Sequence, residues 1–338
     1  KDGALGARND VHCVSIEHKM GIKASPTAVL QYGDNGGAVG YIVGQENRGL
    51  EYMFIMMNSA RYAVGMQGIA IAERAYQKAV AFAKDRVQSR PVDGSINASA
   101  PIIHHPDVKR MLMTMRAYTE GCRAMASVAA AAYDAAHHHP DAEARKQNQA
   151  FYEFMVPLVK GYSTGMSLEG TSLGVQVHGG MGFIEETGAA QFYRDVRVTA
   201  IYEGTNGIQA MDLVARKMMD GGAAAFALMD EIKDAVEASE LTTLAASVGQ
   251  ANEALRASTE QLVGQTDLNN RFAGAVPYLA GFARVLGGYY HLLAAQAEGG
   301  NGPRTKLAAF YINRLLPEHS GLFEHAKQGA ADLYAISI

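Results

Sequence analysis

One stretch of the 338-residue chain combines residue types that could move a proton and hold a cofactor. It reads Glu203-Gly204-Thr205-Asn206-Gly207-Ile208-Gln209 and follows Arg194-Asp195 and Ile201-Tyr202. A carboxylate beside a glycine is able to remove a carbon-bound proton. Thr-Asn-Gly is typical of a helix start, where backbone N–H groups favour an anionic ligand. The stretch therefore predicts a catalytic base, Glu203, next to a helix terminus that binds a cofactor.

The composition indicates a globular and mainly helical protein that holds these residues in place. Hydrophobic residues make up 48% of the chain and charged residues 19%, as in ordinary globular proteins. Alanine-rich stretches with few β-branched residues favour helix. Because 338 residues exceed one ordinary domain, we expect more than one domain.

The hydrophobic pattern changes near residue 47. Before it, short apolar segments at 11–16, 29–32 and 39–43 predict strands, and the run Gly33-Asp34-Asn35-Gly36-Gly37 predicts a hairpin turn. After it, apolar residues recur with the helical period, which indicates a bundle of long helices. We expect helices over 47–86, 106–137, 142–177, 207–218, 228–264, 269–298, 302–316 and 319–335.

Several classes of protein are disfavoured by charge and by motif. The net charge is -4 and no Lys/Arg run occurs, so we expect no nucleic-acid partner. No apolar run reaches the length of a membrane span and no signal peptide opens the chain, so we expect a cytoplasmic protein. Cys13 and Cys122 have no CxxC partner, and consecutive histidines at 137–139 point in different directions on a helix. We therefore predict no metal site.

The stretch around Glu203, together with Gln176-Val177-His178-Gly179-Gly180, resembles the catalytic signature of the acyl-CoA dehydrogenases. The resemblance covers most of residues 10–217. It is strongest to the subgroup with an added C-terminal helical domain, which includes the methylmercaptopropionyl-CoA dehydrogenases. In that family an N-terminal helical domain and a central β-domain precede a four-helix bundle.

The resemblance implies a mainly α chain with three parts. Residues 1–46 would be the C-terminal remnant of the β-domain, residues 47–220 the acyl-CoA dehydrogenase-like four-helix bundle with the signature, and residues 221–338 an extra helical module. The first domain and the first half of the β-domain are expected to be missing. We therefore expect a C-terminal part of a longer protein, which begins within the β-domain.

The implied reaction is flavin-dependent α,β-desaturation of an acyl-CoA thioester, as in fatty acid metabolism. Glu203 would take the α-proton while hydride leaves the β-carbon for flavin adenine dinucleotide (FAD). Some family members carry the base just before the arginine that corresponds to Arg61. Here Ala60 stands at that position, which leaves Glu203 as the candidate base. The family also implies an electron-transfer flavoprotein as electron acceptor, and a homodimer or tetramer.

The resemblance implies flavin contacts from three motifs. Arg86 corresponds to an arginine on the dinucleotide phosphates, and Gln88 keeps a hydrogen-bond donor although the motif around it departs from the family. The run from Gln176 to Gly180 would meet the adenine half across a dimer interface. The implied cofactor residues are Arg86, Gln88, Gln176, Val177, His178, Gly179, Gly180, Thr205, Asn206 and Gly207.

Three further residues are implied to border the substrate, and plainer roles remain open for many of these positions. Asn58 and Arg61 would lie near the acyl-CoA, and Gly204 against the thioester. Alternatively, Arg86 is a solvated arginine at a helix end, and the Gly179-Gly180 pair is only a helix C-cap. In the same way, Glu203 could be a carboxylate favoured at a helix N-terminus.

Two other functions also remain open. One is an acyl-CoA oxidase or a flavoprotein similar to the nitroalkane oxidases, although the latter use Asp as the base. The other is a non-catalytic helical module for oligomerisation or interaction. Flavin binding in the family also needs residues that precede Lys1, so the activity of this chain by itself is left open.

Overall fold

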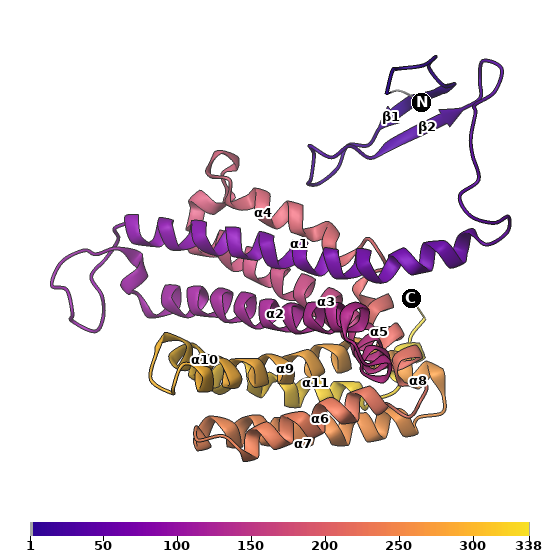
Figure 1. The fold of residues 1–338 in the computed structure, drawn as a ribbon. Coiled ribbons are helices and arrows are strands. Elements are labelled where there is room, and N and C mark those ends of the chain that lie inside the picture. Colours follow the sequence, from indigo (N-terminus) through magenta and orange to yellow (C-terminus); the bar gives the residue numbers. More distant parts are fainter. Residues whose placement is uncertain (1–2, 338) are drawn as a thin grey trace. The chain divides into compact units, whose positions relative to one another are not determined.

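The computed structural model describes residues 3–337, and it divides the chain into two compact units that meet between Met57 and Asn58. Strands and loops make up most of the first unit, and helices make up the second (Figure 1). Among the described residues, no helix is long and apolar enough to cross a membrane. The mainly α fold predicted from the sequence is therefore confirmed.

The first unit contains a two-stranded antiparallel sheet of β1 (Val11–Ile16) and β2 (Ala28–Tyr32). The prediction of a third strand at 39–43 was wrong, since this segment has no strand structure. Its backbone bonds to a side chain instead: Val39 N donates to Asn9 Oδ1 at 2.9 Å, and Asn9 Nδ2 donates to Val39 O at 2.8 Å. The predicted hairpin turn at 33–37 was also wrong, because β1 and β2 are joined by residues 17–27; the run at 33–37 bonds instead to Asp10, whose carboxylate accepts from Asn35 N at 2.6 Å.

The second unit consists mainly of helices. The first of these, α1, starts in the first unit and continues into the second. The bundle helices are α1 (Gly49–Asp85), α2 (Pro106–His138), α3 (Ala142–Val177), α4 (Ala189–Val196) and α5 (Asn206–Val214). The later helices are α6 (Ala223–Glu237), α7 (Thr242–Gly264), α8 (Leu268–Ala273), α9 (Ala275–Ala297), α10 (Pro303–Arg314) and α11 (His319–Ala326). Short 3₁₀ turns occupy Ile102–His104, Gly179–Phe183, Glu185–Thr187, Arg197–Ala200, Arg216–Met218, Leu316–Glu318 and Asp332–Tyr334.

Some helix boundaries follow from local sequence signals, and others depend on contacts with distant parts of the chain. Pro106 begins α2, and the Asp141 carboxylate caps α3 by accepting from two backbone N–H groups, so both starts follow local rules. The single helices predicted over 228–264 and 269–298 were wrong, because each is two helices. The second break falls at Gly274, where a side chain would collide with the carbonyl of Ala326. The helix predicted over 319–335 likewise ends at Ala326.

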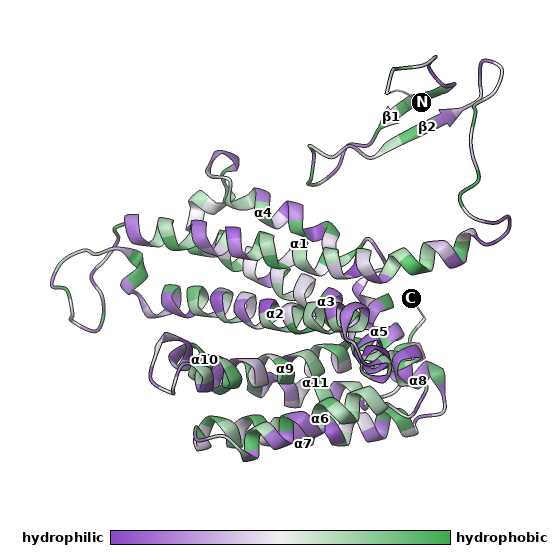
Figure 2. Cartoon of the chain, viewed as in Figure 1, coloured by the Kyte–Doolittle hydropathy of each residue, from purple (hydrophilic) through white to green (hydrophobic). Residues whose placement is uncertain are grey.

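The core lies where α9 meets the bundle. Helix α9 packs against α2, α3 and α5 on one side and against α7, α10 and α11 on the other, and most of its residues are buried. The segment of α3 from Tyr152 to Thr164 is buried throughout, apart from half-exposed Glu153. In Figure 2, hydrophilic and hydrophobic residues alternate along α6 and α7, as expected for helices with one face on the core. Helices α3 and α9 thus form the buried framework.

Helix α1 approaches α3 closely at Gly65. A Cβ built on Gly65 would lie 2.8 Å from Val159 Cγ1 and 3.0 Å from the carbonyl oxygen of Val159. The second distance involves backbone of α3, which a rotamer change does not relieve. Glycine therefore fixes the spacing of the two helices four residues after Arg61, one of the predicted site residues.

A buried arginine on α9 joins the later helices to the bundle. The Arg284 side chain donates from Nη1 to Tyr118 Oη at 2.7 Å and pairs through Nη2 with Glu318 at 2.6 Å. Its guanidinium also lies 5.1 Å from the ring centre of Tyr118 and 5.9 Å from that of Tyr162. Tyr311 Oη donates to Arg284 O at 3.0 Å. One side chain thus connects α2, α3 and α9 and the turn after α10.

We expect Gly65→Ala to lower the free energy of unfolding by about 1–2 kcal/mol, because the added methyl group pushes α1 from α3. Gly170→Ala is the matched control, since Gly170 lies inside α3 and a Cβ built there meets no atom within 4 Å. Alanine is the better helix former, so the control should be neutral or more stable. Urea unfolding of the two variants measures the difference, and equal stability would contradict the close packing.

We expect Tyr311→Phe to reduce the loss of stability at alkaline pH. Burial raises the pKa of Tyr311 to about 12, so the unfolded chain loses this proton first, from about pH 10 upward. Stability is thus fully present below pH 10 and falls as pH rises toward 12. Between pH 8 and 10.5 the variant should lose about 1 kcal/mol less than the unchanged chain in urea unfolding. Exposed Tyr334→Phe is the control and should leave the pH dependence unchanged.

Candidate active site

Glu203 lies in a strained turn that ends at the start of α5. Its φ is +55°, in the left-handed region, and that of Gly204 is +84°. For a residue with a side chain this conformation costs roughly 1–2 kcal/mol. Glycine is required at 204, because a Cβ there would lie 3.0 Å from Gln209 Nε2 and 3.3 Å from Ile208 Cγ2. Strain of this kind persists only where the surroundings hold it, which is common at functional sites.

A lysine of α3 donates hydrogen bonds to this turn. The Nζ atom of Lys160 donates to Gly204 O at 2.7 Å and to Asn206 Oδ1 at 3.1 Å. The amide of Gln209, on α5, donates to Glu203 O at 3.3 Å and to Gly204 O at 3.2 Å. Both carbonyls of the turn therefore accept from side chains of the helical core.

Close to Glu203 lies the ammonium group of Lys160, a charged group that is rarely found in the interior of a protein. The Lys160 side chain is fully buried, with 0% of the residue exposed. Burial lowers the pKa of Lys160 to about 8, and the positive charge of Arg61 acts in the same direction. The carboxylate of half-buried Glu203 opposes both effects. A buried cation thus lies close enough to the candidate base for the two charges to interact.

Arg61 on α1 forms the second cationic neighbour of this turn. Its Nη1 atom pairs with Asp212 Oδ2 at 3.0 Å, and Asp212 Oδ1 accepts from Arg216 Nε at 2.5 Å. A Cβ built on Gly204 would lie 3.7 Å from Arg61 Nη2. The buried Nε of Arg61 has no hydrogen-bond partner among residues 3–337. Asn58 lies one helical turn earlier on the same face of α1 and is half-buried.

An open pocket lies beside the first turn of α5. Thr205 caps the helix by accepting from Ile208 N at 3.3 Å. Asn206 and Gly207 line the pocket together with Tyr193 and Arg197. A helix N-terminus and an arginine favour an anion, and a tyrosine offers an aromatic face. Glu169 adds one carboxyl group to the lining, and burial raises its pKa. The residues present fit a phosphate-bearing cofactor.

The side chain of Asn206 is engaged inside the protein. Its Oδ1 accepts from Lys160 and also from Thr164 Oγ1, the latter at 3.0 Å, and its Nδ2 donates to Gly161 O at 3.0 Å. The amide is therefore occupied by α3, which leaves the backbone at this position for a ligand. Predicted ligand donors at Asn206 are thus reduced to one N–H group.

The other predicted cofactor residues lie at the far end of α3. Arg86 is exposed at the end of α1 and donates from Nη2 to Gln88 Oε1 at 3.4 Å. The ring of His178 is buried, stacks on Phe82 with ring centres 4.4 Å apart, and bonds through Nδ1 to Gly174 O at 2.7 Å. Burial lowers the pKa of His178.

Gln176 lies sixteen positions after Lys160 on α3, which corresponds to about 24 Å of helix. Gly179 has a φ of +57°, which suits glycine, whereas Gly180 has an ordinary φ. A Cβ built on Gly180 would meet no atom within 4 Å. The structure thus brings Arg61, Glu203, Gly204 and Thr205 to Gly207 together, with Asn58 one helical turn before Arg61, and it places Arg86, Gln88 and Gln176 to Gly180 in a second group.

Sequence reasoning missed the residues that support the turn, namely Lys160, Gln209 and Asp212, and it missed Arg197 in the pocket. Lys160 carried a signal, because it ends the apolar run Met155-Val156-Pro157-Leu158-Val159 within a helix. A lone lysine in such a run indicates a buried charge with a specific partner. Gln209 carried none, because its bonds to the carbonyls of Glu203 and Gly204 depend on the shape of the turn, and Asp212 carried none, because it pairs with Arg61 of another helix.

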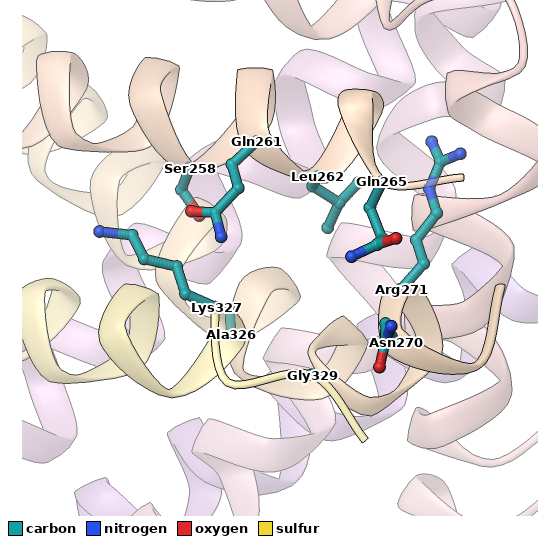
Figure 3. A pocket seen from close by; sticks show the side chains of 9 residues that line it. All are labelled: Ser258, Gln261, Leu262, Gln265, Asn270, Arg271, Ala326, Lys327 and Gly329. Atoms are coloured by element: carbon teal, nitrogen blue, oxygen red, sulfur yellow. The ribbon is translucent and has the colours of Figure 1, made fainter. Parts of the chain in front are cut away.

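A second cavity, between α7, α8 and the end of α11, is too small for a cofactor. It measures about 30 Å³ and is lined mainly by polar residues, among them Ser258, Gln265, Arg271 and Lys327. Figure 3 shows the head groups of Arg271 and Lys327 at opposite ends of this group of side chains. A volume of this size fits about one water molecule. The pocket at α5 is therefore the better candidate for ligand binding.

Comparison with known families gives two matches. Residues 47–219 match the family described as "Acyl-CoA dehydrogenase, C-terminal domain", and residues 228–337 match "Acetyl-CoA dehydrogenase C-terminal like". The first match contains α1 to α5 with the turn at Glu203, and the second contains most of the later helices.

Curated relatives extend these matches over most of the chain. The chain is 52% identical over 313 residues to 3-methylmercaptopropionyl-CoA dehydrogenase of Ruegeria pomeroyi, covering 89% of this chain and 52% of the relative. It is 35% identical over 306 residues to the broad-specificity linear acyl-CoA dehydrogenase FadE5 of Mycobacterium tuberculosis, covering 88% and 46%. The chain thus spans about half the length of the curated relatives it matches.

Solved structures agree in fold. An acyl-CoA dehydrogenase of Bacillus anthracis complexed with FAD gives a TM-score of 0.74 at 21% identity, covering 94% of this chain and 56% of that one. ACDH-11 of Caenorhabditis elegans in complex with C11-CoA gives 0.73 at 20% identity, covering 90% and 50%. The family match over residues 47–219 covers half of the sequence. The chain therefore belongs to the acyl-CoA dehydrogenase family.

Proposed function

We propose that the protein desaturates an acyl-CoA thioester between its α- and β-carbons, with Glu203 as the base. The observation that carries this proposal is the position of Glu203. Half-buried Glu203 lies in a left-handed turn that two core side chains hold, and Thr205, two residues later, lines a pocket at a helix N-terminus. Family membership supports the reaction class, because the relatives are acyl-CoA dehydrogenases.

FAD is the proposed cofactor, and the pocket at α5 supports it. The backbone N–H groups of Asn206 and Gly207 and the guanidinium of Arg197 would hold its phosphates. When bound, the flavin supplies an acceptor for the hydride that leaves the β-carbon. A solved relative from Bacillus anthracis is complexed with FAD, which is consistent with this choice.

The chain's own part of the reaction is to position the thioester and take one proton. The Glu203 carboxylate would remove the α-hydrogen as a proton and become a carboxylic acid. The electron pair of that C–H bond then forms the new double bond as the β-hydrogen departs with its own pair. Arg61 and Asn58, on one face of α1, would border the acyl-CoA, with Gly204 against the thioester. Alignment of base and α-carbon is the main contribution expected from this arrangement.

A homo-oligomer is proposed because the cofactor residues form two groups. The second group consists of Arg86, Gln88 and the run from Gln176 to Gly180. Along α3, Gln176 lies about 24 Å from Lys160, which bonds to the turn that bears Glu203. If two copies pack in symmetric fashion, the second group of one copy could serve the flavin of the other. The open surroundings of Gly180 would then leave room for that ligand.

The proposed substrate is an acyl-CoA, and the proposed electron acceptor is an electron-transfer flavoprotein. The relative with 52% identity carries the name 3-methylmercaptopropionyl-CoA dehydrogenase, so this thioester is the first to test. Butyryl-CoA and longer linear acyl-CoAs are the natural comparison, since other relatives carry the names butyryl-CoA dehydrogenase and linear acyl-CoA dehydrogenase.

We expect Glu203→Gln to abolish bleaching of bound flavin by acyl-CoA, with a loss of at least about 100-fold, because the amide is not a base. The experiment uses a chain extended N-terminally to the length of the relatives and loaded with FAD. The visible absorption spectrum reports flavin content before mixing and bleaching afterwards. Retained flavin without bleaching is the expected result.

Glu186→Gln is the matched control, because Glu186 is an exposed glutamate in the 3₁₀ turn Glu185–Thr187. It should bleach at the rate of the unchanged protein. Full activity in Glu203→Gln would refute the assignment of the base. The same spectrum taken on residues 1–338 alone tells whether this chain retains FAD.

A further inference from the structure

A fully buried lysine needs a reason, and for Lys160 the reason lies in its two acceptors. Moving an ammonium group from water into the interior is costly unless hydrogen bonds compensate. The Lys160 ammonium bonds to the carbonyl oxygen of Gly204 and to the amide oxygen of Asn206. These residues flank Thr205 directly after Glu203, so both bonds go to one short segment.

The first acceptor belongs to the strained turn. The carbonyl of Gly204 receives Lys160 at 2.7 Å and Gln209 at 3.2 Å, so two donors converge on it. The shorter bond comes from a charged donor, which makes it the stronger of the two. Without it, the backbone at Glu203 would lose one of the contacts that offset its left-handed conformation. A shift of the backbone at Glu203 and Gly204 would move the Glu203 carboxylate.

The second acceptor ties the first residue of α5 to α3. Asn206 Oδ1 receives Lys160 and Thr164, and its Nδ2 donates to Gly161 O. Three residues within five positions of α3 therefore bind the helix start, and Lys160 is the one that also binds the turn. A single side chain thus sets the position of the turn relative to the N-terminus of α5.

We infer that Lys160 is a positioning residue for the base: its buried ammonium fixes the Glu203–Gly204 turn to α3 and so aims the Glu203 carboxylate at the α-carbon of the substrate. This inference rests on the proposed function, because it takes Glu203 as the base. Lys160 acts through the turn and touches neither the substrate nor the reacting atoms.

The test isolates proton removal from hydride transfer. The probe is a 3-thia-acyl-CoA, in which sulfur replaces the β-carbon, so the α-hydrogen is removable but no β-hydride is available. The extended, FAD-loaded protein is mixed with this probe in D₂O, and mass spectrometry follows deuterium uptake at the α-carbon. In Lys160→Met we expect uptake 10–100-fold slower, since small misplacement of a reacting group costs about this much. Flavin content and the binding constant of the probe should change less than threefold.

Lys217→Met is the matched control. Lys217 is also a largely buried lysine of the helical unit, with 14% of its side chain exposed, and it pairs with Glu153 at 3.4 Å. Loss of that bond should leave deuterium uptake unchanged. If Lys160→Met gives no folded protein, Lys160→Gln takes its place, since it keeps an N–H donor of shorter reach and should show the same slowing.

Three outcomes separate this inference from the proposed function. Uptake in Lys160→Met within twofold of the unchanged protein, with Glu203→Gln inactive, overturns the inference and leaves the base assignment intact. Uptake in Glu203→Gln at the unchanged rate overturns the proposed function itself. Slowing in Lys160→Met together with a matching loss of probe binding points to general loosening of the site, which also overturns a positioning role.

Discussion

A buried ammonium on α3 constrains the whole candidate site. Lys160 is inaccessible to water, so the protein must supply its hydrogen-bond acceptors, and they come from the turn at Gly204 and from Asn206. Because the cost of an unsatisfied buried charge exceeds the strain of one left-handed residue, this turn is held in a conformation that a free chain rarely adopts. The position of Glu203 is therefore set by the core rather than by its own loop.

The later helices also contact the segment of α3 that contains Lys160. A Cβ built on Gly161, the residue after Lys160, would lie 3.1 Å from Leu279 Cδ1 of α9. One residue further, Tyr162 faces the guanidinium of Arg284, also on α9. Helix α9 thus backs the segment of α3 that supports the turn, and it packs against α5 as well. Helix α9 lies within the second family match, so that part of the chain contacts the segment of α3 that holds the turn at Glu203.

The sequence predicted those features that depend on local signals. The three long helices follow from periodic apolar residues, and local signals mark two of their starts, Pro106 for α2 and the Asp141 cap for α3. The helix start at Thr205 follows from its capping hydroxyl. The break at Gly274 was missed because glycine is needed there to avoid the carbonyl of Ala326, which lies far along the chain. Segment 39–43 was predicted as a strand, but at Val39 both backbone bonds go to the Asn9 side chain, a contact with no local signal.

The same distinction applies within the candidate site. Glu203 and the glycine after it could be identified from their motif, since the chemistry is carried by adjacent residues. The partners of Lys160 and Arg61 could not be predicted, because Lys160 donates across 44 positions of sequence and Arg61 pairs across 151. Gly180 shows the limit of a single chain. Its φ is ordinary and no described atom lies within 4 Å of an added Cβ, so packing within this copy does not require glycine there. The close approach proposed above, by a ligand or by a second subunit, would give a physical reason for that residue type.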